Sequence, residues 1–111
     1  MNYRVAKVED TAQILALCSE HKIEPPSGKI FVAEQEGRII GICAAKMQAI
    51  IEPLISENPA ASAKLVSMAE GLLIGTGNKS VMVLSDKYEN LFTKYGFIKL
   101  DKTVMEKYYD G

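Results

Sequence analysis

Apolar residues near the start of the chain recur at intervals that predict a strand, a helix and a loop. Tyr3 and Val5 alternate with polar or small neighbours, which predicts a short first strand. Helical spacing follows, from Asp10 as a candidate N-cap to about Glu20. Residues 21–29 contain two prolines and a glycine, break this periodicity and predict a loop. The expected apolar face of the helix consists of Ala12, Ile14, Leu15, Leu17 and Cys18.

The next pattern predicts a β-hairpin. Two apolar runs, Ile30 to Gln35 and Arg38 to Ala45, are separated only by Glu36-Gly37, and a two-residue connection with glycine is typical of a tight hairpin turn. The second run is apolar at successive positions, so we expect helices to cover both faces of the sheet. Only Lys46-Met47 separates it from the following strand, which we therefore expect to pair with it in the antiparallel direction.

The stretch from Gln48 to Leu84 predicts a strand, a helix and a second strand. The first strand runs to Ile55, but Pro53 lacks an amide hydrogen and predicts that strand pairing is interrupted there. Asn58-Pro59 is a strong helix start, because asparagine can cap free amides and proline already has a helical φ. Residues 80–84 predict a parallel strand, reached by a right-handed crossover. The expected buried stripe of the helix is Leu65, Met68, Ala69, Leu72 and Leu73.

The end of the chain predicts a last helix and a terminal hairpin. Ser85 and Asp86 are candidate helix caps, and two further strands are expected at Phe97 to Leu100 and Thr103 to Tyr109. The complete order of elements predicts an α+β fold in one domain, residues 1–111. Its single mixed sheet is expected to be mostly antiparallel, with one splayed parallel strand pair and helices on both faces. The inner face of the last helix is expected to be Leu91, Phe92 and Tyr95.

Composition and charge exclude several classes of protein. The chain has 111 residues, of which 48% are hydrophobic and 24% charged, a balance typical of a soluble globular domain. With a net charge of −1 and scattered basic residues, we expect no binding to nucleic acid or to an anionic membrane. Cys18 and Cys43 lack metal-ligand spacing, and His21 is the single histidine, so no metal site is expected. We expect both thiols to be buried and reduced in a cytoplasmic protein, with a disulfide as the alternative.

The start of the helix at Asn58 is a candidate site for an anionic ligand. A helix N-terminus presents free amides and the positive end of the helix dipole, and the interrupted strand before it provides space. The alternative is an ordinary strand–helix connection whose cap is satisfied within the chain.

The order of elements and four short motifs resemble the GCN5-related N-acetyltransferase family. The motifs are FVAEQEGRIIG at residues 31–41, IEPL at 51–54, AEGLL at 69–73 and NLFTKYGF at 90–97, and the resemblance covers nearly the whole chain. It implies an acyl-CoA-binding domain with acetyl-CoA between the fourth and fifth strands, here residues 48–55 and 80–84. It also implies transfer of the acetyl group to a primary amine by direct attack.

The resemblance assigns candidate roles to residues around that opening. Glu52, on the fourth strand, is the candidate general base, acting through water on the amine. Phe92 occupies the position of the family's general-acid tyrosine. Tyr95 is therefore the candidate acid, and Tyr88, one turn before Phe92, is the other nearby tyrosine. Strand amides near Leu54 to Ser56 are candidates for stabilising the oxyanion. The expected acetyl-CoA contacts are Leu54, Ile55, Ser56, Ala60, Ala61, Ser62, Ala63, Lys64, Ser85 and Phe92.

The chain departs from the family where phosphates would bind. The family has an arginine and two glycines before its helix, and this chain has small residues from Ala60 to Ala63 followed by Lys64. Together with the missing tyrosine, this favours an alternative: a non-catalytic protein of the same fold that binds another protein or forms a homodimer through a sheet edge. The short segment 21–29 replaces the family's second helix, so an active protein would have an open acceptor site suited to a protein tail.

Overall fold

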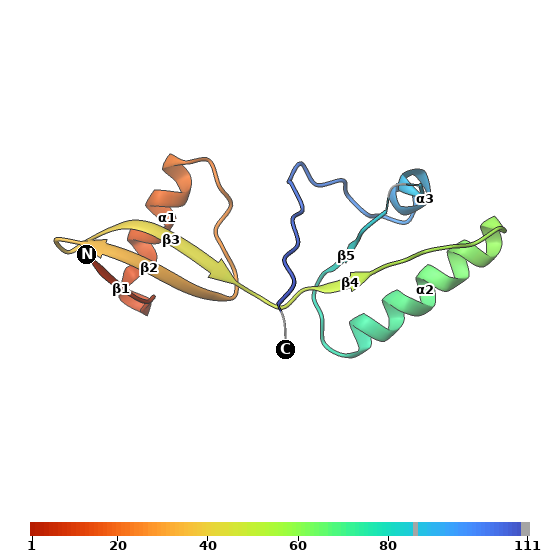
Figure 1. Cartoon of the computed structure of the whole chain (residues 1–111), viewed down its shortest axis with the longest axis horizontal. Helices are drawn as coiled ribbons and strands as arrows, with labels where there is room; N and C mark the ends of the chain where they lie inside the picture. The colour runs from red at the N-terminus through yellow and green to blue at the C-terminus, as the bar shows by residue number, and fades with distance from the viewer. Residues whose placement is uncertain (86, 110–111) are drawn as a thin grey trace. The chain divides into compact units, whose positions relative to one another are not determined.

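A computed structural model describes residues 1–85 and 87–109, so the predicted cap Asp86 lies outside the described residues. The chain divides into two compact units, Met1–Met47 and Gln48–Gly111, called here the N-terminal and the C-terminal unit (Figure 1). In the described part of the chain, no helix combines the length and the apolar character needed to cross a lipid bilayer.

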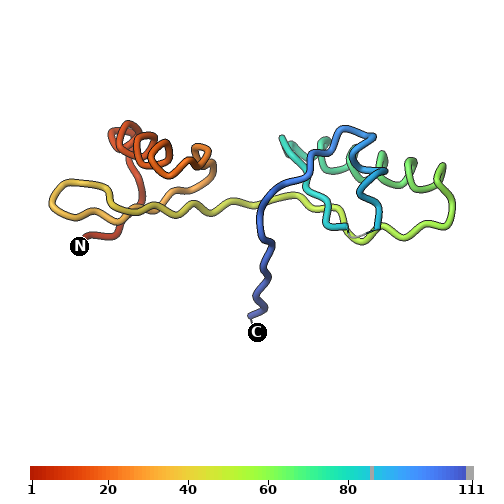
Figure 2. Tube along the Cα trace, turned by 90° about the horizontal axis from the view of Figure 1, so that it is seen from above, coloured from red at the N-terminus to blue at the C-terminus, as the bar shows by residue number. Residues whose placement is uncertain are grey.

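The N-terminal unit is an antiparallel sheet with one helix against it. Its strands occur in the spatial order β1-β2-β3. A short 3₁₀ turn and helix α1 connect β1 to β2, and α1 lies along one face of the sheet (Figures 1 and 2). These elements confirm the strands, the helix and the loop predicted for this half of the chain. Their bounds are β1 Asn2–Val5, the 3₁₀ turn Val8–Asp10, α1 Thr11–Glu20, β2 Lys29–Gln35 and β3 Arg38–Ala45.

The predicted hairpin between β2 and β3 is confirmed in detail. Glu36 and Gly37 form the two-residue turn, with φ of 52° and 77°. Two successive positive φ angles are typical of the type I′ turn, whose twist matches that of paired strands. A shift of register between Ala33 and Glu34 places a bulge in the ladder near the turn.

The two faces of the three-stranded sheet differ. On the face towards α1, a core of Ile14, Cys18, Val32 and Ile39 is buried. The strand pairing places Tyr3, Val5, Phe31 and Cys43 together on the opposite face. All four of these residues are exposed. Within the N-terminal unit a helix covers one face of the sheet, where the sequence predicts helices on both. The expected burial of the Cys43 thiol is wrong, because Cys43 is exposed. Both cysteines are free.

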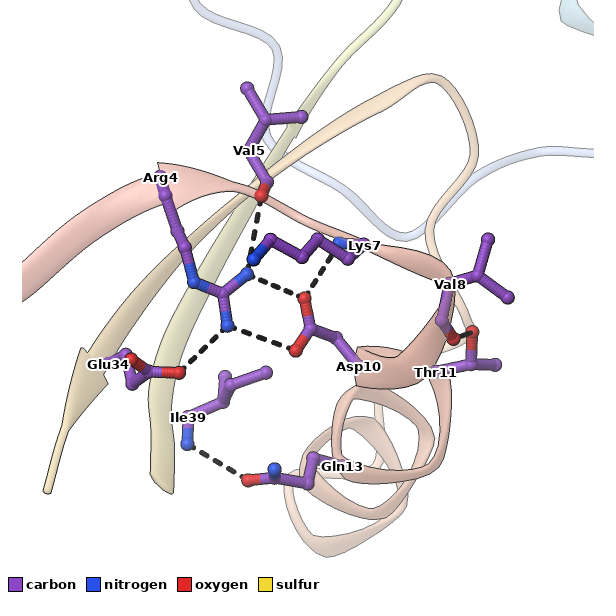
Figure 3. Close-up of polar contacts among 9 residues, drawn as sticks. All are labelled: Arg4, Val5, Lys7, Val8, Asp10, Thr11, Gln13, Glu34 and Ile39. Atoms are coloured by element: carbon purple, nitrogen blue, oxygen red, sulfur yellow. Dashed lines mark hydrogen bonds and ion pairs between the residues drawn. The ribbon is translucent and has the colours of Figure 1, made fainter. Parts of the chain in front are cut away.

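An ion-pair network joins β1, the start of α1 and β2 (Figure 3). Arg4 donates two hydrogen bonds to Asp10, Nη1 to Oδ2 at 2.7 Å and Nη2 to Oδ1 at 3.0 Å, and a third to Glu34 Oε2 at 2.8 Å. The Lys7 amide donates to Asp10 Oδ2 at 2.7 Å. Asp10 is only 5% exposed. Its carboxylate therefore binds Arg4 and the Lys7 amide rather than capping α1 with a side-chain hydrogen bond, although Asp10 does occupy the N-cap position.

The same network shifts the pKa values of its acidic members. The hydrogen bonds from Arg4 and, second, from the Lys7 amide lower the pKa of Asp10 to about 2. The hydrogen bond from Arg4 also lowers the pKa of Glu34. A separate bond, from the Ile39 amide to Gln13 Oε1 at 3.0 Å, fixes α1 to the edge strand β3 (Figure 3).

The C-terminal unit is built on a strand, a helix and a parallel strand. Strands β4 and β5 pair in parallel, as predicted, and α2 packs on both. The structure gives them as a parallel pair separate from the three-stranded sheet of the N-terminal unit, where the sequence predicts one mixed sheet with β3 beside β4. The fold is α+β, with an antiparallel sheet and a separate parallel pair. The bounds are β4 Ala49–Ile51, α2 Pro59–Gly75, β5 Val81–Val83 and α3 Glu89–Lys94.

Helix α2 begins where the sequence predicts, but its buried side overlaps only part of the predicted stripe, through the half-buried Ala69 and Leu73. Its buried residues are Ser62 and Val66, whereas Leu65, Met68 and Leu72 of the predicted stripe are exposed. The helix is apolar around most of its circumference, so hydrophobic spacing alone fits more than one choice of face.

The last part of the chain differs most from expectation. Helix α3 is short, and its buried residue Phe92 packs edge-on against Phe97 with ring centroids 5.3 Å apart. Tyr95, predicted on the inner face, is exposed at the C-cap. Residues 97–109 contain no strand, so the predicted terminal hairpin is wrong. Their apolar residues find no neighbouring strand among the described residues, and an unpaired segment forms no ladder.

Candidate functional site

A cleft opens beyond the carboxyl ends of β4 and β5. The last residue pair of their ladder is Ile51 with Val83, followed by one hydrogen bond from the Leu84 amide to the Ile51 carbonyl at 3.3 Å. Pro53 then provides no amide for a further bond, so the strands separate at the residue where the sequence predicts an interruption. The cleft has a volume of about 480 Å³ and is lined by Glu52, Pro53, Leu54, Ile55, Leu84, Ser85, Lys87 and Tyr88.

Tyr88 bridges the two walls of this cleft. Its hydroxyl accepts a hydrogen bond from the Ser56 amide at 3.2 Å and donates one to the Ser56 carbonyl at 3.4 Å. Ser85 orients the start of the Tyr88 segment, because its hydroxyl accepts the Tyr88 amide at 3.1 Å. The Ser56 amide, predicted as an oxyanion donor, is thus already bonded to a side chain. Among the described residues, the amides of Leu54 and Ile55 have no such partner.

Opposite charges lie on the two walls of the cleft. Glu52 comes from the wall that continues β4, and Lys87 from the wall that continues β5; both side chains are exposed. The field of Glu52 also reaches the C-terminal segment. The pKa of Tyr108 is raised, mainly by a hydrogen bond with Glu106, then by desolvation and by the negative charge of Glu52. The cleft therefore offers a carboxylate to a cation and an ammonium group to an anion.

The predicted phosphate contacts at the start of α2 do not line the cleft. Asn58 Oδ1 accepts the amides of Ala60 and Ala61 at 2.9 and 3.1 Å, and Pro59 has no amide hydrogen. Ser62 is buried, with its hydroxyl bonded to the Asn58 carbonyl at 3.1 Å. The helix start is therefore capped within the chain, which was the alternative considered from the sequence. Ala63 and Lys64 also lie outside the cleft lining.

The sequence-based site thus divides into two groups. Glu52, Leu54, Ile55 and Ser85 are brought together around the cleft, and Ser56 adjoins it through Tyr88. Phe92 is buried against Phe97, and Tyr95 is not part of the lining.

Two polar residues of the lining were missed or not chosen in the sequence analysis. Lys87 was missed, although its position directly after the second strand of a parallel pair was a usable signal. Tyr88 was noted but not chosen as the acid, although it is the tyrosine in the cleft. Among the described residues, no cluster of three or more Cys, His, Asp or Glu side chains is arranged to hold a metal ion.

Comparison with known proteins gives limited information. No protein-family model matches the chain, and no curated protein matches it. Among solved structures, the chain is similar to a predicted acetyltransferase from Clostridium acetobutylicum that was crystallised with acetyl-CoA. The similarity extends over 96% of this chain and 95% of that one, with 16% sequence identity and a TM-score of 0.41. This similarity is too distant to assign the chain to a family.

Proposed function

We propose that the protein binds acetyl-CoA or a related acyl-CoA in the cleft between β4 and β5 and transfers the acyl group to a primary amine. The observation that carries the proposal is the separation of two parallel strands directly before Glu52-Pro53, with a carboxylate, a lysine and a tyrosine around the opening. Ligands of open sheets with parallel strands bind beyond the carboxyl ends of the strands. The motif resemblance of the sequence supports the same ligand and the same place.

The cleft suits the acyl-pantetheine end of such a ligand. Its volume of about 480 Å³ lies within the usual range of small-molecule sites. Leu54, Ile55 and Leu84 provide apolar walls for an extended chain, and the amides of Leu54 and Ile55 are available for its carbonyl groups. We assign the attraction of the phosphates to Lys87 rather than to Lys64, because Asn58 already occupies the amides at the start of α2.

Each polar residue of the cleft has a step in the proposed transfer. Glu52 attracts the protonated amine and accepts its proton, directly or through water. The amine nitrogen then attacks the thioester carbonyl carbon, and the amides of Leu54 and Ile55 stabilise the oxyanion. The carbon–sulfur bond breaks, the departing thiolate takes a proton from a donor, and the attacking nitrogen loses its second proton to water, which returns a proton to that donor.

Tyr88 replaces Tyr95 as the proposed donor of that proton, because Tyr88 lines the cleft. Its bond to the Ser56 carbonyl, at 3.4 Å, is long for a hydroxyl donor. The proton can therefore be redirected to a thiolate while the hydroxyl oxygen continues to accept the Ser56 amide.

Isothermal titration of the whole chain with acetyl-CoA tests the binding step. Lys87→Glu should weaken binding at least tenfold, whereas Lys64→Glu, a matched charge reversal at the start of α2, should leave it within twofold. If Lys64→Glu has the larger effect, the phosphates bind at the helix start. The absence of binding at millimolar acetyl-CoA would refute the proposal.

A thiol-release assay with a panel of primary amines tests the chemistry. Glu52→Gln should lower the rate by about 10²- to 10⁴-fold, the usual contribution of a general base. Glu57→Gln, an exposed change outside the cleft, is the control. Tyr88→Phe should lower kcat by a larger factor than it weakens acetyl-CoA binding if Tyr88 is the acid, because it removes the proton donor as well as the bridge to Ser56. Equal rates for the Glu52 and Glu57 variants would eliminate the assigned base.

One observation favours a second candidate, a non-catalytic protein that keeps this fold. The amides that relatives would offer to phosphates are bonded to Asn58, so the start of α2 has the features of a structural cap. This candidate predicts neither acetyl-CoA binding nor thiol release, and the titration above separates the two.

A further inference from the structure

The start of helix α2 leaves no amide for an anion. Its first residue, Pro59, has no amide hydrogen, and the amides of Ala60 and Ala61 donate to Asn58 Oδ1 at 2.9 and 3.1 Å. The next amide, that of Ser62, donates to the Asn58 carbonyl at 2.9 Å. A helix binds phosphate through amides that have no partner within the chain. This helix start therefore lacks the groups that would hold a diphosphate.

Ser56 holds the capping residue in place. Its hydroxyl donates to the Asn58 carbonyl at 2.9 Å and accepts the Asn58 amide at 3.3 Å. Ser56 is itself bonded to Tyr88 on the opposite wall of the cleft, at 3.2 and 3.4 Å. A ligand that displaced the Asn58 side chain would disturb this connected set of hydrogen bonds. The cap of α2 is thus fixed by the same residues that fix the walls of the cleft.

The charges around the cleft provide for one phosphate. Among the described residues that line the cleft, Lys87 is the one cation, and Lys64 of α2 lies outside this lining. Glu57, which is exposed, precedes the cap of α2 by one residue. A carboxylate close to the first turn of a helix takes up the favourable interaction with the helix dipole that a phosphate would otherwise have. CoA carries a diphosphate and a ribose phosphate, so most of its negative charge finds no cation in this lining.

The volume of the cleft also fits part of CoA better than the whole molecule. At about 480 Å³ it lies in the lower half of the usual range of small-molecule sites. Its apolar walls, Leu54, Ile55 and Leu84, suit the narrow acyl-pantetheine arm. The nucleotide at the other end of that arm then lies beyond the cleft.

We propose that recognition of the acyl donor ends at its first phosphate. The cleft binds the acyl-4′-phosphopantetheine group, with the phosphate beside the Lys87 ammonium group, and the nucleotide of CoA contributes nothing to affinity. This inference rests on the proposed function and adds the chemical class of its donor: a thioester of phosphopantetheine, with or without a nucleotide. The closed start of α2 is then compatible with an active protein, because a donor held by one phosphate needs no free helix amides.

Three thioesters that differ only beyond the pantetheine arm test the proposal: acetyl-CoA, acetyl-4′-phosphopantetheine and acetyl-pantetheine. The dissociation constants of the first two, measured by isothermal titration of the whole chain, should agree within threefold. Removal of the remaining phosphate, in acetyl-pantetheine, should weaken binding at least tenfold, because the ion pair with Lys87 is lost. A preference for acetyl-CoA over acetyl-phosphopantetheine greater than threefold, or a smaller loss without the phosphate, would overturn the proposal.

The same three donors distinguish a wrong donor class from a wrong function. If acetyl-CoA binds and acetyl-phosphopantetheine does not, the cleft is an acyl-CoA site and only the limit at the first phosphate is refuted. If none of the three thioesters binds at millimolar concentration, the proposed function is refuted as well. In the thiol-release assay, kcat/KM for acetyl-CoA and acetyl-phosphopantetheine should also agree within threefold.

Two variants assign the phosphate contact to a residue. In Lys87→Ala, acetyl-pantetheine and acetyl-phosphopantetheine should bind within twofold of each other, whereas Lys64→Ala, outside the lining, should keep the wild-type ratio. Both lysines are exposed, so we expect both variants to fold, and circular dichroism checks this. A wild-type ratio in Lys87→Ala, or an equal reduction in both variants, would overturn the assignment.

The salt dependence of binding provides a measure that needs no substitution. Salt screens ion pairs between exposed groups, and the loss of affinity grows with the number of pairs. Raising sodium chloride from 50 to 500 mM should weaken acetyl-CoA and acetyl-phosphopantetheine by the same factor, within twofold, because each makes one phosphate contact. A steeper loss for acetyl-CoA would reveal a second phosphate contact and overturn the proposal.

Discussion

The N-terminal and the C-terminal unit are stabilised in different ways. In the N-terminal unit, three strands and one helix enclose a continuous apolar core, and Arg4 joins Asp10 to Glu34 across it. The C-terminal unit has strands of three residues and isolated buried side chains such as Phe92. The cleft lies in this second unit. The difference indicates that the proposed binding site belongs to the less densely packed part of the chain.

The largest expected effects come from removing one buried side chain in each unit. Ile14→Ala should lower the free energy of unfolding of the N-terminal unit by about 2–5 kcal/mol, and Phe92→Ala that of the C-terminal unit by about 3–5 kcal/mol. Because the C-terminal unit has fewer buried side chains, we expect Phe92→Ala to remove a larger share of that unit's protection against hydrogen exchange. Hydrogen exchange followed by mass spectrometry of peptides from each unit measures both changes. Equal residual protection of α1 and α3 in the two variants would contradict the contrast.

The second effect is a loss of folding stability at low pH that is specific to the N-terminal unit. The pKa of Asp10 is lowered to about 2 in the folded state, below its ordinary value near 3.8. Its ion pair with Arg4 therefore adds stability above pH 4, and this stability is lost as the pH falls from about 4 to about 2. Exchange of the α1 amides should accelerate over that interval. The Asp10→Asn variant should be less stable at pH 7 and show a smaller acid dependence; an unchanged acid profile would contradict the role of the ion pair.

The third effect tests the hairpin that defines the N-terminal unit. Gly37→Ala forces a side chain into a turn position with φ of 77° and should cost about 1–2 kcal/mol. The Cβ atom would meet nothing within 4 Å, so backbone strain is the cause and not a clash. Thermal unfolding monitored by circular dichroism measures the loss, with Gly71→Ala, on an ordinary helical backbone, as the control. The control is expected to gain stability, because alanine favours a helix over glycine; a Gly37→Ala protein that loses no stability would show that the turn relaxes.

The smallest effect concerns the cap of α2. Asn58→Ala should cost about 1 kcal/mol, because it removes the acceptor of the Ala60 and Ala61 amides. Asn58→Gly should cost only a few tenths of a kcal/mol while exposing the same amides. Acetyl-CoA affinity should be unchanged in the glycine variant if Lys87 attracts the phosphates. A tenfold gain in affinity would instead place the phosphates at the helix start.

Local chemistry made parts of this structure predictable from the sequence. The Glu36-Gly37 turn, the Asn58-Pro59 helix start and the interruption at Pro53 all follow from the conformations that individual residues permit. The cleft was predictable to the same extent, because it lies where the interrupted strand leaves its parallel partner. Leu54, Ile55 and Ser85, which the sequence analysis expects to contact acetyl-CoA, line this cleft.

The failures concern choices that local chemistry does not settle. The apolar spacing of α2 fits several faces, so the sequence did not distinguish Val66, which is buried, from Leu65, which is exposed. The alternation in residues 103–109 is a strand pattern, but a strand also needs a partner, and pairing between distant segments is not encoded by spacing. Which tyrosine faces the cleft depends on where α3 begins, one turn later than predicted.

The bridge from Tyr88 to Ser56 has a consequence for the thermodynamics of ligand binding. One hydroxyl group bonds to both the amide and the carbonyl of a residue on the opposite wall, so the separation of the walls is already set in the free protein. The conformational entropy of ordering these segments is then lost during folding and not again when a ligand enters. A preorganised cleft of this kind favours tighter binding, because no free energy is spent on ordering the walls around the ligand.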